Sequence, residues 1–190
     1  MRENILINQI LDEKESSIAK EILLVISGVI FLGLVSQVVM PLPFTPVPIT
    51  GQTFGILLLG LVYGKKLGLK TIGAYLAAGS LGMPVFLGGT SGLLFLRPTG
   101  GYLIGFFFAV MLCGYLTEKG WAKSYGKTLL IMILAEIVLY TFGLVHLSLF
   151  VKGNVLLMGL YPFLAGEVIK IALITLILPS AWKIFGDIKK

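Results

Sequence analysis

The sequence predicts an all-α integral membrane protein with six transmembrane helices and both termini in the cytoplasm. Of its 190 residues, 57% are hydrophobic and 13% are charged, and the mean hydropathy is +0.99. Ordinary soluble domains are about 45–50% apolar and about 25% charged, so a soluble fold is excluded. A membrane-spanning helix needs about 20 apolar residues, so the chain has room for about six spans and no appended soluble domain.

The apolar runs between charged and turn residues predict the spans in order. The second run is short, and the third contains four glycines, which allow close approach of neighbouring helices. The six candidate spans are residues 22–40, 51–63, 67–86, 101–116, 128–151 and 162–182. We expect residues 22–185 to form the membrane domain.

The two ends of the chain are predicted to lie outside the membrane. Residues 1–21 carry charges of both signs and lack the basic region, apolar core and cleavage site of a signal peptide. We expect this segment to be retained in the cytoplasm with a short amphipathic helix. Residues 186–190 are expected to form a cytoplasmic tail.

The basic residues predict the orientation, because Lys and Arg are enriched in short cytoplasmic loops. With the amino terminus inside, twelve of the fifteen cations are cytoplasmic and two are external, while Lys170 falls within the sixth span. The cytoplasmic set is Arg2, Lys14, Lys20, Lys65, Lys66, Lys70, Lys119, Lys123, Lys127, Lys183, Lys189 and Lys190, and the external set is Arg97 and Lys152.

Several function classes are excluded by what the sequence lacks. One cysteine, Cys113, and one histidine, His146, cannot form an internal disulfide or a Cys/His metal site. Gly126–Thr128 resembles the end of a phosphate-binding loop, but Trp121 stands where that loop needs a glycine. Neither a hydrolytic triad nor a basic-aromatic nucleic-acid patch is present. We therefore expect no enzyme activity, cofactor, metal or nucleic-acid partner, and any active transport must draw its energy from another protein or an ion gradient.

Two external connections, residues 40–52 and 84–101, are poor in charge and rich in proline and glycine. Non-helical backbone at membrane depth is tolerated only where protein or a cavity covers it, so we expect the two segments to fold over one another and close a site. Phe44, Phe86, Phe95 and Tyr102 border them. These aromatic residues fit either an interfacial belt or the walls of a pocket for an apolar ligand.

Charged residues inside the spans are the strongest functional signal, because such charges are costly and normally face a cavity. Glu167 and Lys170, three residues apart, lie on one face of the helix that Pro162 begins. Glu136 has no basic residue one turn away, which leaves open either a proton-coupling role or a neutral helix contact. His146 is expected to form an interhelical hydrogen bond. A pocket with one lysine, one acid, hydroxyls and aromatic walls would suit a small anion with a polar ring and an aliphatic body.

Four motifs in this order resemble the BioY family, the biotin-specific substrate-binding (S) components of energy-coupling factor (ECF) transporters. The motifs are PFTPVPITGQ at residues 43–52, GMPVFLGGTSG at 82–92, PTGGY at 98–102 and GEVIK at 166–170. The resemblance covers about residues 22–185 and implies a six-helix S-component-like fold that binds biotin near the outer face. It further implies the bacterial cytoplasmic membrane, a transmembrane coupling (T) protein and ATP-binding (A) subunits. The alternative is a stand-alone ion-coupled carrier.

The resemblance also implies the binding residues. A lysine ammonium is the natural partner of the biotin carboxylate, and the acid and a threonine suit the ureido ring, although the reverse arrangement of the two ends stays open. Family members commonly have Asp at position 167, and Arg97 is a second candidate cation. The complete candidate set is Lys170, Glu167, Thr90, Phe86, Tyr102, Gly89, Gln52, Thr45 and Arg97.

Overall fold

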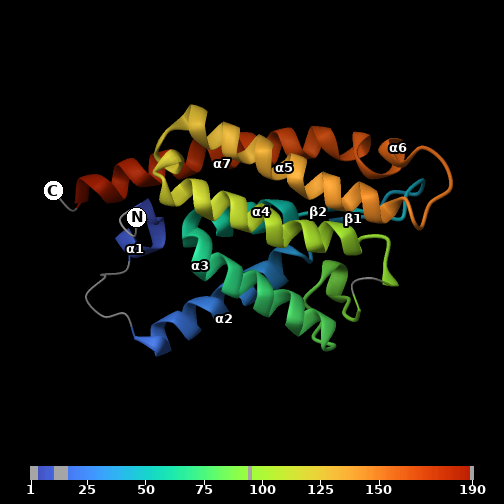
Figure 1. The fold of residues 1–190 in the computed structure, drawn as a ribbon, viewed down its shortest axis with the longest axis horizontal. Coiled ribbons are helices and arrows are strands. Elements are labelled where there is room, and N and C mark those ends of the chain that lie inside the picture. Colours follow the sequence, from blue (N-terminus) through green and yellow to red (C-terminus); the bar gives the residue numbers. More distant parts are fainter. Residues whose placement is uncertain (1–3, 11–16, 94–95, 189–190) are drawn as a thin grey trace.

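The computed structural model describes residues 4–10, 17–93 and 96–188 and consists mainly of helices packed into an elongated bundle (Figure 1). Helix α4 packs between α3 and α5, while α2 covers α3 and α7 covers α5. Phe95, Arg2, Lys14, Lys189 and Lys190 lie outside the described residues. The elements are α1 (Leu6–Ile10), α2 (Ile18–Val35), β1 (Val39–Met40), β2 (Ile49–Thr50), α3 (Gln52–Ser80), α4 (Gly100–Glu118), α5 (Tyr125–Leu147), α6 (Val155–Gly159) and α7 (Tyr161–Ile188).

Four helices in the described part of the chain are long and apolar enough to cross a membrane: α2, α4, α5 and the Tyr161–Phe185 part of α7. Sequence analysis predicted six spans. The difference lies in α3, where lysines and glycines interrupt the apolar sequence, so that this helix does not qualify as a span. The two runs expected at residues 51–63 and 67–86 both fall largely within α3, which ends at Ser80.

Helix α3 is divided by a sharp bend at Gly64, whose φ of 71° and ψ of −174° are not helical. A positive φ strongly favours glycine, because the Cβ of another residue would collide with its own backbone. The bend separates legs at residues 52–63 and 65–80, about 18 Å and about 24 Å long. The Glu118 side chain of α4 accepts a hydrogen bond from the Lys65 amide at 2.9 Å, which caps the second leg where it begins.

One end of the bundle carries α1, the bend in α3 and the carboxyl end of α7 (Figure 1). Among the described residues, four lysines at this end lie over aromatic rings: Lys119 and Lys65 over Tyr115 at 4.4 Å and 6.0 Å, Lys123 over Trp182 and Lys183 over Tyr125. Such pairs keep a charged head near water while the aromatic ring packs on the helices. These lysines belong to the set predicted to be cytoplasmic, and they lie together at one end of the bundle.

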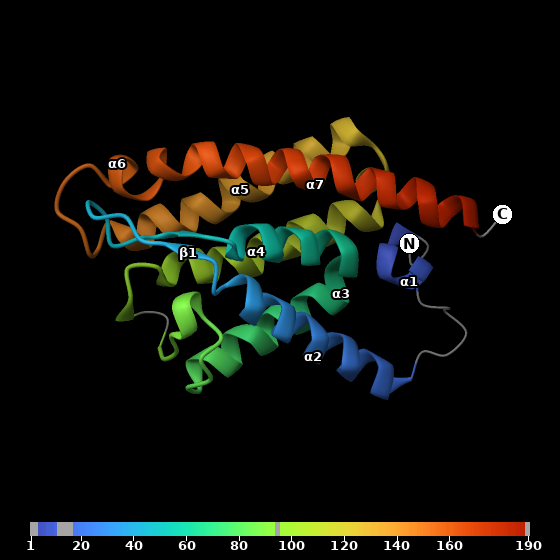
Figure 2. The same cartoon turned by 180° about the vertical axis from the view of Figure 1, so that it is seen from behind.

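The opposite end holds the connections that the sequence singled out (Figure 2). Strands β1 and β2 pair antiparallel and bring the proline-rich segment back onto the start of α3. Thr45 in this segment donates a hydrogen bond to the Met158 carbonyl of α6 at 2.6 Å. Between α3 and α4, the second segment is held to the end of α2, where the Ser36 hydroxyl lies 2.8 Å from the Val85 carbonyl. Both segments therefore cover the same end of the bundle.

The core between α4 and α5 depends on close helix contact. A Cβ atom at Gly105 would lie 2.8 Å from the Leu139 carbonyl oxygen, so only glycine allows this approach. The helices here pack through small residues, as is typical where lipid provides no hydrophobic drive for association.

Candidate ligand-binding site

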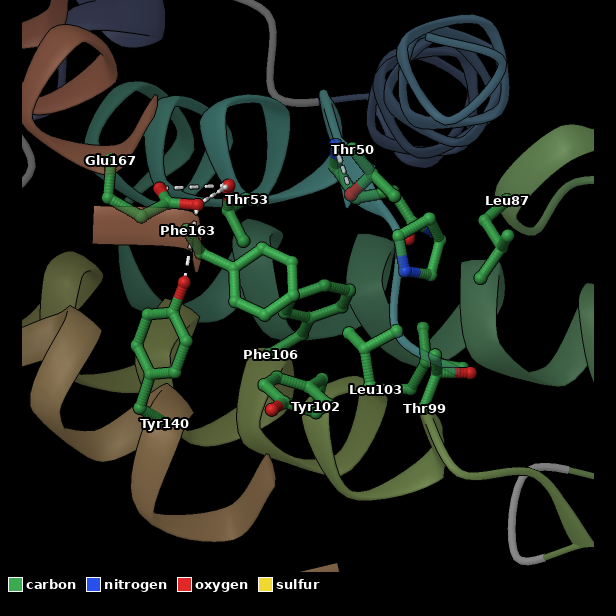
Figure 3. Close-up of a pocket in the computed structure, with 13 residues that line it drawn as sticks. Thr50, Thr53, Leu87, Thr99, Tyr102, Leu103, Phe106, Tyr140, Phe163 and Glu167 are labelled. Carbon is green, nitrogen blue, oxygen red and sulfur yellow. Dashed lines mark hydrogen bonds between the residues drawn. The ribbon is translucent and has the colours of Figure 1, made fainter. Parts of the chain in front are cut away.

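A cavity of about 40 Å³ lies at the loop-bearing end, between the first turns of α3 and α4, the halves of α5 and α7 nearest the connections, and the two connections (Figure 3). This volume holds only a few water molecules. The apolar lining residues are Val47, Pro48, Leu87, Leu103, Phe106 and Phe163, and the polar ones are Thr50, Gln52, Thr53, Thr99, Tyr102, Tyr140 and Glu167.

Glu167 and Lys170 of α7 form an ion pair at one wall of this cavity, with 2.8 Å between the ammonium and Oε1. The Thr53 hydroxyl lies 3.1 Å from each carboxylate oxygen, and the Tyr140 hydroxyl lies 3.4 Å from Oε1. In the view of Figure 3, Thr53 and Tyr140 point toward this carboxylate from α3 and α5. The Glu167 charge is nearly buried and is compensated by a cation and two hydroxyl donors.

The Lys170 ammonium uses all three of its donors within the protein. It bonds to the Thr50 carbonyl at 2.8 Å, to the Thr53 hydroxyl at 2.7 Å and to Glu167. Lys170 therefore joins the end of β2, the start of α3 and its own helix. A ligand anion that binds this ammonium must replace one of these three acceptors.

The local sequence explains why these groups meet. Pro162 lies in the first turn of α7, where its missing amide hydrogen costs nothing, and Glu167 and Lys170 follow at a spacing that places them on one face. The β-hairpin returns the chain so that α3 begins at Gln52, next to this face. Gln52 in turn donates to the Tyr75 hydroxyl at 2.7 Å within α3.

Three of the nine predicted site residues line the cavity: Glu167, Tyr102 and Gln52. The Tyr102 hydroxyl donates to the Gly159 carbonyl at 2.7 Å, so this residue presents its ring rather than its hydroxyl to the cavity. Gln52 is likewise committed to Tyr75. Lys170 is not among the lining residues and lies behind Glu167 and Thr53.

The remaining predicted residues stabilise the connections instead of lining the cavity. Phe86 is 2% exposed and packs against the ring of Tyr75, with ring centroids 5.4 Å apart. The Thr90 hydroxyl donates to the Leu87 carbonyl, and Gly89 adopts a φ of 75° in the same turn.

Thr45 and Arg97 are also engaged away from the cavity. Thr45 joins the proline-rich segment to α6, as described above. Arg97 donates to the Ser91 carbonyl within its own loop. In this arrangement, Arg97 supplies no cation to the cavity wall, and its role as a binding residue stays a prediction.

Sequence reasoning missed Thr53, Tyr140 and Phe163, all of which line the cavity. A helical signal existed for two of them, because Phe163 precedes Glu167 by one turn and Tyr140 follows Glu136 by one turn. His146 of α5 lies 3.0 Å from the Arg97 carbonyl through Nε2, so it contacts the second connection.

A bundle of apolar helices with a small, mainly apolar pocket and a buried ion pair at its wall defines a membrane protein that binds a small molecule, the class to which transporter subunits belong. The chain belongs to the BioY family, whose family model matches residues 7–187. This family consists of transporter components rather than enzymes.

Individual relatives agree with this assignment. The chain is 35% identical to the biotin transporter BioY of Rhizobium etli, over 75% of this chain and 80% of that protein. It is 36% identical to a probable biotin transporter BioY of Pyrococcus horikoshii, over 81% and 91%. Its fold is similar to the crystal structure of the S-component for biotin from an ECF-type ABC transporter, with a TM-score of 0.76, 29% identity, and coverage of 87% of this chain and 92% of that one.

Proposed function

We propose that this chain binds biotin with high affinity and is the substrate-specific component of an ECF-type transporter for biotin uptake. The observation that carries the proposal is the pocket at the loop-bearing end, which combines the Glu167–Lys170 pair with the aromatic walls of Phe106 and Phe163. Biotin has matching parts: a carboxylate, a polar ureido ring, and an apolar chain and thiophane ring. The similarity to biotin transporters supports the same ligand.

In the proposed complex, the Lys170 ammonium pairs with the biotin carboxylate, because a charge-assisted bond is the strongest that this pocket offers. Glu167 and Thr53 bind the ureido N–H groups and oxygen, and Tyr102 packs on the apolar part of the ligand. The opposite orientation would place the ureido ring at Lys170. The other predicted residues act through the connections that cover the site.

The pocket must widen for this ligand, since about 40 Å³ is far less than biotin occupies. The proline-rich segment at residues 41–48 is the natural element to move, because its side-chain attachment to α6 is the single Thr45 hydrogen bond among the described contacts, whereas Thr50 after it is held to α7 by Lys170. Val47 and Pro48 of this segment line the cavity directly. Its displacement would open the site toward the loop-bearing end.

We further propose that the two legs of α3 complete six membrane crossings, with both termini in the cytoplasm and the pocket near the outer face of the cytoplasmic membrane. The lysines around the α3 bend and at the α4–α5 connection support this orientation. A coupling membrane protein and ATP-binding subunits supply the energy, and the chain itself catalyses no bond change.

The experiment that tests ligand and orientation together is calorimetric titration of the purified chain in detergent with biotin, biotin methyl ester and lipoate. We expect tight one-to-one binding of biotin and none of lipoate. The methyl ester is expected to bind the unchanged chain weakly, and Lys170→Ala is expected to bind biotin and its ester alike. Lys152→Ala, an exposed lysine at the same end, is the matched control. Absence of biotin binding by folded protein would overturn the proposal.

A second experiment separates the proposal from the ion-coupled carrier. Vesicles that contain the chain alone, and vesicles that also contain coupling protein and ATPases, are compared for biotin uptake. We expect uptake only in the second set and only with ATP. Uptake by the chain alone that collapses with the ion gradient would support the carrier.

A further inference from the structure

Glu136 is a second buried acid beside the pocket that the proposed complex leaves unused. It lies in the middle of α5, one turn from Tyr140, and is 7% exposed. Neither carboxyl oxygen has a hydrogen-bond partner of suitable geometry among the described residues. Glu167 and Lys170 of α7 are close enough to act on it electrostatically. Buried polar groups nearly always have a partner, so this one requires an explanation.

The surroundings of Glu136 favour its neutral form. An ionised carboxylate without a donor is costly in a buried site, and a second negative charge beside Glu167 adds repulsion. The other titratable groups that face it are Tyr140 of α5 and the buried Cys113 of α4, neither of which carries a positive charge at neutral pH. In its neutral form, Glu136 has an O–H donor to offer.

Glu167 has no need of that donor while the pocket is closed. Its carboxylate already accepts from Lys170, Thr53 and Tyr140. When an anionic group of the ligand binds the Lys170 ammonium, Glu167 loses both its cation and its strongest hydrogen-bond donor. The Glu136 O–H on α5 thus has no acceptor among the described residues, while the Glu167 carboxylate on α7 loses a donor when the ligand binds.

We propose that protonated Glu136 is a positioning residue that donates a hydrogen bond to Glu167 when Lys170 turns to the carboxylate of the ligand. The inference rests on the proposed function. In this exchange the Lys170–Glu167 bond breaks and the Glu136–Glu167 bond forms. No proton leaves the protein, since the hydrogen of Glu136 is shared with Glu167. The neutral acid thereby keeps Glu167 oriented for the ureido ring while Lys170 is engaged elsewhere.

The test compares biotin affinity in Glu136→Gln, Glu136→Leu and the unchanged chain, with Met132→Leu, one turn away and fully buried, as the matched control. Glutamine retains an N–H donor of similar size, whereas leucine has none. We expect the leucine variant to bind biotin about ten-fold or more weakly, since a bond to a charged group is lost. The glutamine variant is expected to stay within about three-fold, like the control.

The pH dependence of biotin affinity is a second readout, which a change in packing alone would not alter. Alkaline pH removes the proton of Glu136 in the unchanged chain, so affinity should fall there more than in the glutamine variant, which has no such proton. Because this comparison does not involve leucine, it holds even if Glu136→Leu folds poorly.

The outcomes separate the two proposals. Equal affinity of the leucine variant and the unchanged chain, or superimposable pH profiles of the glutamine variant and the unchanged chain, would overturn this inference alone. Failure of the unchanged chain to bind biotin would overturn the proposed function and this inference with it. A glutamine variant as weak as the leucine variant would show that the negative charge is required, and would also overturn the donor role.

Discussion

Replacing Thr53 by valine is expected to destabilise the protein because the change removes a hydroxyl that joins both charges of the pocket. The Thr53 hydroxyl accepts from Lys170 at 2.7 Å and lies 3.1 Å from the Glu167 oxygens, to one of which it donates. Hydrogen bonds to charged groups contribute about 1.5–3 kcal/mol each, and valine has nearly the shape of threonine. Since Lys170 and Glu167 keep other partners, we expect a net loss of about 2–4 kcal/mol.

The assay is thermal unfolding of the purified protein in detergent without ligand. For a chain of this length, such a loss lowers the midpoint by about 5–15 °C. The matched control is Thr117→Val, which removes a hydroxyl of α4 that is fully buried but has no partner among the described residues. This change should shift the midpoint little or raise it, because no bond is lost. Equal shifts in the two variants, or no shift for Thr53→Val, would refute the reasoning.

Three further changes test other parts of the structure. Lys170→Ala should weaken biotin binding by about 1.5–3 kcal/mol, or roughly 10–150-fold by calorimetry, while Lys152→Ala binds normally; normal binding by Lys170→Ala would place the pocket elsewhere. Gly105→Ala should lower the unfolding midpoint, because the added methyl group collides with the α5 backbone. The control Gly126→Ala places its methyl group in open space and should leave the midpoint unchanged. Equal midpoints in the two variants would contradict the close helix contact. Thr45→Val should speed biotin dissociation about five-fold in stopped flow, since about 1 kcal/mol of attachment to α6 is lost, and an unchanged rate would show that this bond does not hold the segment closed.

The arrangement of helices followed from the sequence where apolar runs are long, and the predicted break between residues 63 and 67 coincides with the bend at Gly64. Runs at 101–116, 128–151 and 162–182 correspond to α4, α5 and α7, each displaced by a few residues. The break between the second and third runs was visible as lysines and glycines. The sharpness of the bend at Gly64 depends on a backbone angle, and the start of the second leg depends on a cap from α4; hydropathy reports neither of these.

The charged part of the pocket was predictable because helical spacing places Glu167 and Lys170 on one face, and burial of charge in a membrane is costly. The wall of the pocket that faces them was not predictable, since Thr53 and Tyr140 come from other helices and no sequence pattern marks them. Residues in the connections were assigned by motif alone. Thr90 and Arg97 turned out to bond their own loops, because a loop that covers a site must first satisfy its own backbone groups.

The bend in α3 also has a consequence for how the protein enters the membrane. Each leg, about 18 Å or about 24 Å long, is shorter than an apolar layer about 30 Å thick, so the adjoining connection must complete its crossing, and we expect the two legs to insert together as a helical hairpin. The cap on the second leg comes from Glu118, which is synthesised more than fifty residues after the bend begins. The second leg therefore has no side-chain cap from α4 until Glu118 emerges from the ribosome. We expect the hairpin to be least stable while the residues between Gly64 and Glu118 are being synthesised.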